Sequence, residues 1–357
     1  MNKENKMEIE AILKQALVMN ASDIFVIAGY HVAYKINGKI QPQSKIVLTP
    51  EMTYDFCKAI FEKRYGSKSP FKFDYELDFS FSLSKIARFR VNLFYQRGSL
   101  AAVLRVVKYS LPDAQKLLIP QPIIDLAKVE NGLVIVSGSA GSGKSTTLAC
   151  IIDKINQTQT KHIITIEDPI EFLFSHNQSI VSQKEIGSDA QSYASALKGA
   201  LREAPDVILV GEMRDLETIS TALTAVETGH TVYSTLHTNG AIETINRIID
   251  VFPSEQQHQI EVQLSSALKV VISQRLINNV DDKLIPVFEV LVVNQAIRTL
   301  IREHKTHQIA NYLANGDNHG ILSLDDSLIK LYQEKVIDKK TALLNAHNKT
   351  LMKAKLK

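Results

Sequence analysis

The sequence predicts an α/β domain with a mainly parallel sheet, preceded by a small α+β domain and followed by C-terminal helices. Three observations carry this prediction. A G-x-x-x-x-G-K-S motif at 138–145 lies between an apolar strand and an apolar helix. Strands at 133–137, 162–166, 206–211 and 231–236 alternate with helical stretches, which predicts a parallel sheet covered by helices. Shorter segments of alternating polarity precede them.

The first 110 residues predict a small α+β domain. An amphipathic helix is expected from Met7 to Leu17, and Thr49 is placed to cap a second helix that Pro50 opens and Phe61 or Tyr65 closes. Residues 24–40 are predicted to form two strands, with turns at 28–30 and 37–38. Further strands are expected at 78–83, 87–95 and 100–107.

Prolines and composition divide the rest of the chain. Residues 111–122 contain Pro112, Pro120 and Pro122 and are predicted to be a linker. The predicted core domain then spans 123–277, and 278–357 is expected to be helical. We expect helices at Val262–Leu276 and Leu324–Lys335, and a basic, solvated tail at the end.

Composition excludes several classes of protein. The 357 residues, 45% hydrophobic, suffice for about two packed domains, and the formal charge of +3 is too small to favour a nucleic-acid surface. Cys57 and Cys150 form no metal-binding or disulfide pattern, which favours a reducing, cytoplasmic setting. Neither a signal peptide nor a membrane span is expected, so membrane association is predicted to depend on partners.

The motif at 138–145 predicts a P-loop that binds nucleoside triphosphate. Glycines let the backbone approach the phosphates, and the following helix directs its N-terminus at them. Lys144 is expected to reach the β and γ phosphates, and Ser145 to hold Mg²⁺. The expected nucleotide-binding residues are Gly138, Ser139, Ala140, Gly141, Ser142, Gly143, Lys144, Ser145 and Thr146.

Acidic residues follow two of the predicted strands. Glu212 ends the apolar run that begins at Asp206, and Gly211 stands where a Walker B motif has aspartate. Glu167, Asp168 and Glu171 follow the strand at 162–166, and a cation would offset the cost of gathering them. Because Pro169 forces an extended turn, the sequence leaves open which of these acids points inward.

Two histidines flank the predicted strand at 231–236. His237 follows its carboxyl end, where a γ-phosphate would lie, and its imidazole is expected to sense the nucleotide. His230 precedes the strand and is the weaker candidate, since an isolated histidine is often structural.

Together these motifs resemble the secretion-type ATPases that power type IV pili, and within them the pilus-retraction ATPases. The resemblance rests on GSAGSGKST, ITIEDPIEF, ALREAPDVILVGEMRDLETI, TGHTVYSTLHT and AIRTLIRE, and it covers nearly the whole chain. It implies a PAS-like N-terminal domain, a RecA-like P-loop ATPase domain and a ring of six subunits. AIRTLIRE has Thr299 where the retraction ATPases usually have asparagine.

The resemblance also implies roles for individual residues. Glu171 is expected to be the general base and Glu212 the acid beside magnesium, although the reverse assignment stays open. Ser145, Glu212 and Glu167 are the expected metal-side residues, and His230 and His237 form the family's histidine box. Arginines are expected at subunit interfaces near the nucleotide, where they would stabilise phosphoryl-transfer charge: Arg88, Arg90, Arg105 and Arg202.

The expected function is therefore an ATP-hydrolysing hexamer that powers pilus retraction, with ATP and Mg²⁺ as cofactors. Its expected partners are an inner-membrane pilus platform protein and, indirectly, pilin, at the cytoplasmic face of the membrane. A pilus-assembly or type II secretion ATPase is the first alternative, although the four-cysteine insertion usual in those proteins does not fit here. A RecA-like nucleic-acid motor is less favoured, because the chain shows no basic, aromatic-interleaved face.

Overall fold

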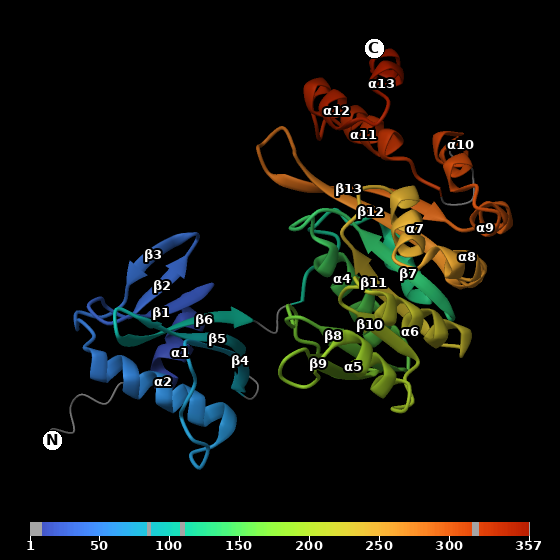
Figure 1. Cartoon of the computed structure of the whole chain (residues 1–357). Coiled ribbons are helices and arrows are strands. Elements are labelled where there is room, and N and C mark those ends of the chain that lie inside the picture. Colours follow the sequence, from blue (N-terminus) through green and yellow to red (C-terminus); the bar gives the residue numbers. More distant parts are fainter. Residues whose placement is uncertain (1–8, 84–86, 108–110, 316–320, 357) are drawn as a thin grey trace. The chain divides into compact units, whose positions relative to one another are not determined.

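The computed structural model describes residues 9–83, 87–107, 111–315 and 321–356. The chain divides into two compact units, one of residues 1–110 with 171–173 and the other of residues 111–170 with 174–357 (Figure 1). The first two residues of the helix predicted from Met7 lie outside the described ranges. Each unit is considered by itself below.

The first unit contains a six-stranded antiparallel sheet in the order β3-β2-β1-β6-β5-β4. Helix α2 begins at Pro50 with Thr49 as its N-cap, as predicted, and ends at Tyr65. The core joins this helix to the sheet through buried side chains such as Phe56, Ile60 and Phe89. The elements are α1 (Ile9–Val18), β1 (Asp23–Val26), β2 (Ala33–Ile36), β3 (Lys39–Pro42), α2 (Pro50–Tyr65), β4 (Glu76–Leu83), β5 (Ala87–Gln96) and β6 (Ser99–Val107).

The prediction of two strands over 24–40 was wrong, because the segment forms three. Both predicted turns are present, and two turns separate three strands. At the second turn Asn37 and Gly38 have φ of 50° and 77°, which suits a tight hairpin. The three later strands lie where the alternation of polarity predicted them.

The second unit contains a seven-stranded sheet in the order β13-β12-β7-β11-β10-β8-β9. Pairing from β12 to β9 is parallel, which confirms the prediction, and only β12 and β13 pair antiparallel. Strand β9 was not predicted. The strands are β7 (Gly132–Ser137), β8 (His162–Glu167), β9 (Ile180–Glu185), β10 (Val207–Val210), β11 (Thr231–Leu236), β12 (Leu268–Asn278) and β13 (Leu284–Val292).

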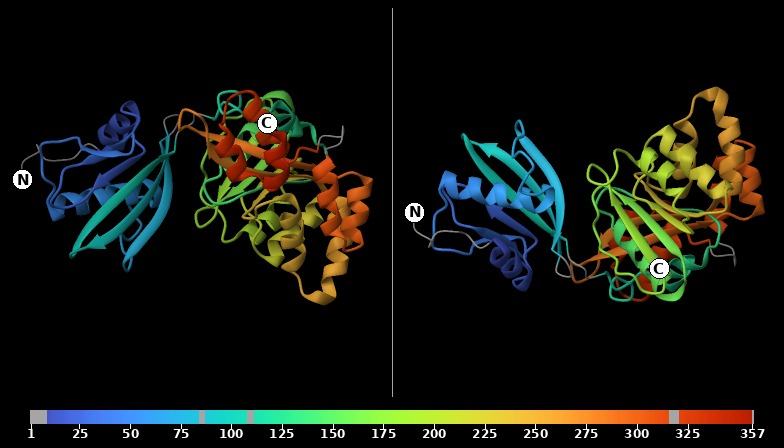
Figure 2. Two further views of the ribbon diagram at one scale, coloured as in Figure 1. Left: turned by 90° about the horizontal axis from the view of Figure 1, so that it is seen from above. Right: turned by 90° about the horizontal axis from the view of Figure 1, so that it is seen from below.

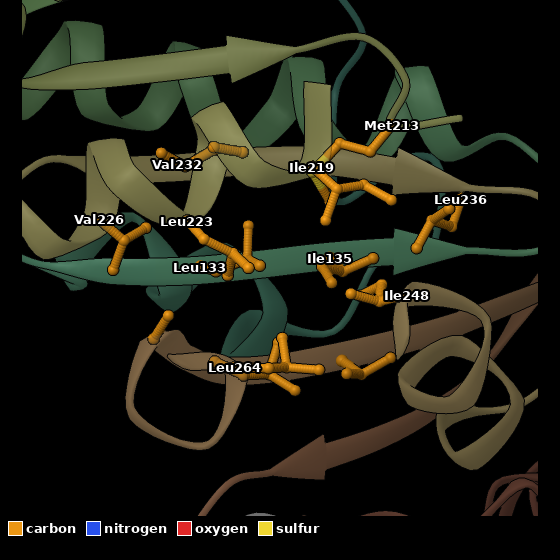
Figure 3. Packing of buried hydrophobic residues seen from close by; sticks show 14 of the residues in the cluster. Leu133, Ile135, Met213, Ile219, Leu223, Val226, Val232, Leu236, Ile248 and Leu264 are labelled. Atoms are coloured by element: carbon orange, nitrogen blue, oxygen red, sulfur yellow. The ribbon is translucent and has the colours of Figure 1, made fainter. Parts of the chain in front are cut away.

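Helices cover both faces of this sheet (Figures 1 and 2). Helix α4 lies on one face, and α6, α7 and α8 lie on the other. Figure 3 shows Leu133 and Ile135 of β7 meeting side chains of α6, among them Ile219 and Leu223, in the largest apolar cluster described. The helices before the hairpin are α3 (Gln121–Ile124), the 3₁₀ turn η2 (Asp125–Lys128), α4 (Lys144–Thr158), α5 (Tyr193–Ala200), α6 (Leu216–Glu227), α7 (Ala241–Asp250) and α8 (Ser254–Ala267).

The helix predicted at Val262–Leu276 was wrong beyond residue 267. There α8 ends and β12 begins, pairing with β7 on one side and β13 on the other. The β-branched run Val270-Val271-Ile272 favours a strand, and a short apolar run alone does not distinguish strand from helix. The predicted domain boundary at 277/278 therefore falls at the end of β12, inside a hairpin.

The C-terminal helices pack beside this hairpin and include the segment predicted to be solvated. That prediction was wrong for Met352 and Leu356, which are each only 1% exposed and join a cluster with Ile277 and Val287, whereas residues 347–351 and 353–355 are exposed. Asp325 accepts hydrogen bonds from the backbone N–H groups of His347 and Asn348. The helices are α9 (Gln295–Arg302), η3 (Thr306–Gln308), α10 (Ile309–Asn315), α11 (Leu324–Gln333), α12 (Lys339–Asn345) and α13 (Lys349–Lys355).

Candidate nucleotide site

The P-loop leaves the carboxyl end of β7 and leads directly into α4. Gly138 is held at the sheet, where its N–H donates to the carbonyl of Leu236 at 3.2 Å. Lys144 is 7% exposed, and its Nζ donates to the carbonyls of Gly138 at 2.9 Å and Ser139 at 3.0 Å. The ammonium group is thus turned back into the loop it follows, as a phosphate-binding lysine requires.

The loop combines buried and exposed positions. Ser142 is buried, and in the described part of the chain its Oγ has no hydrogen-bond partner. Ser139, Ala140 and Ser145 are exposed. Since Ser139 and Ala140 point outward, their side chains leave the backbone N–H groups at the start of α4 available to an anion.

Glu212 lies two residues beyond the end of β10 and is joined to two basic side chains. Its Oε1 is 2.6 Å from Nε of Arg214 and 3.1 Å from Nε2 of His237. The Glu212 side chain is 14% exposed, whereas that of Arg214 is 74% exposed. Hydrogen bonding to Glu212 raises the pKa of Arg214. The sequence placed Glu212 and His237 at the same sheet edge, and the structure brings them into contact.

Tyr193, at the start of α5, explains why glycine occupies the Walker B aspartate position. A Cβ on Gly211 would lie 2.9 Å from Tyr193 Oη and 3.1 Å from the carbonyl oxygen of Ile166, so a side chain does not fit there. Burial raises the pKa of Tyr193, and the charges of Asp168, Glu212 and Glu167 raise it further. Tyr193 was not among the predicted site residues. The sequence feature that indicated a large neighbour is Gly211, which stands where a Walker B motif has aspartate.

The acidic residues at the end of β8 and just after it do not share one environment. Glu167 Oε1 accepts hydrogen bonds from Thr165 Oγ1 at 2.7 Å and Gln183 Nε2 at 3.2 Å. Glu171 is exposed, and within the described ranges its side chain forms no hydrogen bond or ion pair. Of the two expected carboxylates, Glu212 therefore has a defined place beside the P-loop edge, while the role of Glu171 stays a prediction.

The two histidines lie at opposite ends of β11. His237 follows the carboxyl end, next to Leu236, whereas His230 precedes the amino end, where its carbonyl accepts from Gly132 N–H. His230 Nδ1 lies 2.9 Å from the carbonyl of Ala225 and 3.1 Å from Thr228 Oγ1. A six-residue strand separates His230 from the P-loop of its own chain by roughly 20 Å, so its place among the catalytic residues stays a prediction.

Three of the four predicted arginines share one face of the first unit's sheet. Arg88 and Arg90 alternate with buried residues along β5, and Arg105 of β6 is the cross-strand partner of Arg90. Arg105 Nε pairs with Asp23 Oδ1 at 3.1 Å. Arg202 is exposed in the segment between α5 and β10, at the amino-end edge of the seven-stranded sheet.

The hydroxyl of Ser145 and the carboxylate of Glu212 are hard oxygen donors of the kind that Mg²⁺ prefers, so this donor set fits the expected ion. Within the described ranges no three His, Cys, Asp or Glu side chains cluster into a metal site of their own. Magnesium here would depend on phosphate oxygens, as in other P-loop proteins.

None of the helices described is long and apolar enough to span a bilayer.

Known proteins resemble this chain along nearly its full length. A twitching motility protein of Neisseria gonorrhoeae is 46% identical over 278 residues, which cover 78% of this chain and 74% of the relative. A protein of Pseudomonas aeruginosa described as "Type IV pilus retractation ATPase PilT" is 39% identical over 336 residues, covering 94% and 97%. The crystal structure of the pilus retraction motor PilT with bound ADP superposes with a TM-score of 0.84 at 44% identity, covering 97% of this chain and 99% of that one. Residues 3–354 match the family described as "Type II/IV secretion system protein", and the chain belongs to that family.

Proposed function

We propose that this protein is a hexameric motor that hydrolyses ATP to power type IV pilus retraction. One observation carries the proposal. The P-loop, Glu212 and His237 meet at the carboxyl-end edge of a parallel sheet, where open α/β sheets bind their ligands. The similarity to two pilus proteins and to an ADP-bound retraction motor supports the same function.

Within the site, the residues from Gly138 to Thr146 cradle the phosphates, and Lys144 neutralises charge on them. Ser145 and Glu212 would hold Mg²⁺, with Glu167 on the metal side, and the ion would supply electrostatic stabilisation of the transferring phosphoryl group. Glu171 acts as the general base. The reverse assignment, with Glu212 as base and Glu171 beside the metal, stays open, and the two assignments are separable by mutation.

The arginines complete the site between subunits. Arg88, Arg90 and Arg105 lie on one sheet face, and a neighbouring subunit's nucleotide would attract such a cluster. Arg202 serves at another interface. ATP binding then draws subunits together, hydrolysis releases them, and residues 111–122 act as the hinge. Loss of cooperative turnover in Arg90→Ala, with the ring intact by light scattering, would support this arrangement; unchanged turnover would refute it.

The motor works at the cytoplasmic face of the inner membrane, against a pilus platform protein, and acts on pilin indirectly. No nucleic acid takes part.

Deleting the gene and counting surface pili tests whether the motor retracts or assembles pili. Excess filaments support retraction, whereas missing filaments support the alternative of an assembly or secretion ATPase. A Lys144→Ala allele at the same locus is expected to reproduce the deletion. ATP turnover stimulated by DNA would instead favour a nucleic-acid motor.

A further inference from the structure

One residue of β12, Gln274, lies against both ends of the P-loop. A Cβ on Gly138 would collide with the carbonyl oxygen of Gln274. A Cβ on Gly143 would lie 2.9 Å from Gln274 Nε2. The first and last glycines of the motif therefore face the same residue, 131 positions or more further along the chain.

Gln274 also holds the first turn of α4. Its Oε1 accepts a hydrogen bond from Thr147 Oγ1 at 2.7 Å, and Thr147 N–H donates to the carbonyl of Gly143 at 3.0 Å. Gln274 is 2% exposed and Thr147 is completely buried. Leaving a buried hydroxyl without a partner is costly, so this bond constrains where α4 begins.

Its position in the sheet makes Gln274 different from an ordinary packing residue. The pairing of β12 with β7 ends at Ser273, opposite Ser137, and Gln274 is the next residue along β12. It is thus level with the loop rather than with the strand that precedes it. Gly138 N–H is bound by Leu236 of β11 on the other side, so the loop leaves β7 between two fixed neighbours.

From this geometry we propose that Gln274 is a positioning residue for nucleotide binding. Its side chain holds the first turn of α4 through Thr147, while its backbone carbonyl lies close to Gly138 and its side-chain amide close to Gly143. It thereby positions the N–H groups and Lys144 that would meet the phosphates. A displacement of such groups by about 1 Å can lower the rate about 100-fold. The inference rests on the proposed nucleotide site at 138–146.

The test uses purified full-length protein with Gln274→Leu, Thr147→Val and the double variant. Each is measured for the Kd of a fluorescent ADP analogue, KM and kcat for ATP, and Tm. Each single variant is expected to raise Kd and KM about tenfold. The double variant is expected to fall well short of the product of the two effects, because no polar group is then left unpaired.

Arg275→Leu is the matched control. Arg275 is adjacent on β12 but points to the other face, where Nη2 lies 3.0 Å from Nε2 of His347. This variant is expected to lower Tm and leave Kd within about twofold of wild type. Lower Tm with unchanged Kd and KM in Gln274→Leu would overturn the inference, as would fully multiplicative effects in the double variant.

If Gln274→Leu does not fold, Gln274→Asn replaces it, since the shorter amide keeps polarity but withdraws from Thr147 and Gly143. Unchanged Kd and KM in Gln274→Asn would also overturn the inference. Lys144→Ala distinguishes a failure of the proposed nucleotide site from a failure of the role proposed for Gln274. Wild-type turnover in Lys144→Ala would refute the nucleotide site itself, whereas an inactive Lys144→Ala beside a normally binding Gln274→Leu would refute only the role of Gln274.

Discussion

The two edges of the seven-stranded sheet are built from the same strands yet differ in chemistry. At the carboxyl-end edge Glu212 contacts both Arg214 and His237, and the buried Lys144 turns into its loop. At the amino-end edge His230 hydrogen-bonds to the carbonyl of Ala225 near the end of α6 and lies beside the Thr228 hydroxyl. The polar side chains at the carboxyl-end edge lie where a ligand would bind, whereas His230 at the amino-end edge hydrogen-bonds to the end of a helix.

This difference shows that position on a strand decides what a residue can do. His230 and His237 are the same residue type, seven positions apart, and a sequence motif treats them alike. The parallel strands direct only one of them to the edge where helix N-termini and loop N–H groups gather. Mutations at the two edges should therefore separate loss of turnover from loss of stability.

The largest effect is expected for Lys144→Ala. Removing the ammonium group that meets the phosphates should lower ATP turnover about 10³-fold. Phosphate release by purified protein measures it. Lys154→Ala, on the same helix α4, is the control and should keep wild-type turnover. Comparable losses in both variants would mean that the effect comes from the helix and not from the site.

Glu212→Gln is expected to lower kcat about 100-fold, since an amide keeps the shape of the side chain but loses the charge that would face magnesium. The charge partner of Arg214 and His237 is lost with it. Glu217→Gln, in the first turn of α6, serves as the control. Glu171→Gln should be at least as damaging if Glu171 is the general base. A mild Glu171→Gln beside a damaging Glu212→Gln would assign the role of base to Glu212.

Gly211→Asp should destabilise the protein by about 2 kcal/mol, because the new side chain meets Tyr193 Oη and the carbonyl of Ile166. Denaturant unfolding measures this change. Tyr193→Ala in the same chain should recover part of the loss by opening the space. No recovery would show that the backbone, and not Tyr193, excludes aspartate from this Walker B position.

A smaller effect concerns Glu289 of β13, which lies in register with Ser273 and so on the P-loop edge. Burial raises the pKa of Glu289 above its ordinary 4.5, and its Oε1 accepts from Ala241 N–H at 2.8 Å. A raised pKa means that its contribution to stability is complete at pH below about 4.5 and declines as the pH rises through the folded-state value.

Glu289→Gln mimics the protonated form and keeps the acceptor for Ala241. The free energy of unfolding of this variant, relative to wild type, should therefore increase from about pH 4 to pH 8. Glu255→Gln, at an exposed carboxylate in the first turn of α8, should show no such trend. Parallel pH profiles for Glu289→Gln and wild type would mean that Glu289 ionises without cost.

Much of this molecule was predictable because local signals agreed with the fold. The strand, loop and helix around Lys144 and the four parallel strands lie where the sequence predicted them. Strand β12 was missed because a buried apolar run carries no periodicity. Tyr193 and Gln274 were missed because their importance comes from contacts with Gly211 and with the P-loop, far away in sequence.

We expect the carboxyl-end edge of the sheet to serve turnover and the amino-end edge to serve stability. The most direct test compares ATP turnover in His237→Ala and His230→Ala. Loss of His237 frees Glu212 from a contact that orients it, and kcat should fall about 10- to 100-fold. His230→Ala should lower Tm and leave kcat within about twofold, since it removes hydrogen bonds at the end of α6. Wild-type turnover in His237→Ala with a large loss in His230→Ala would contradict the account.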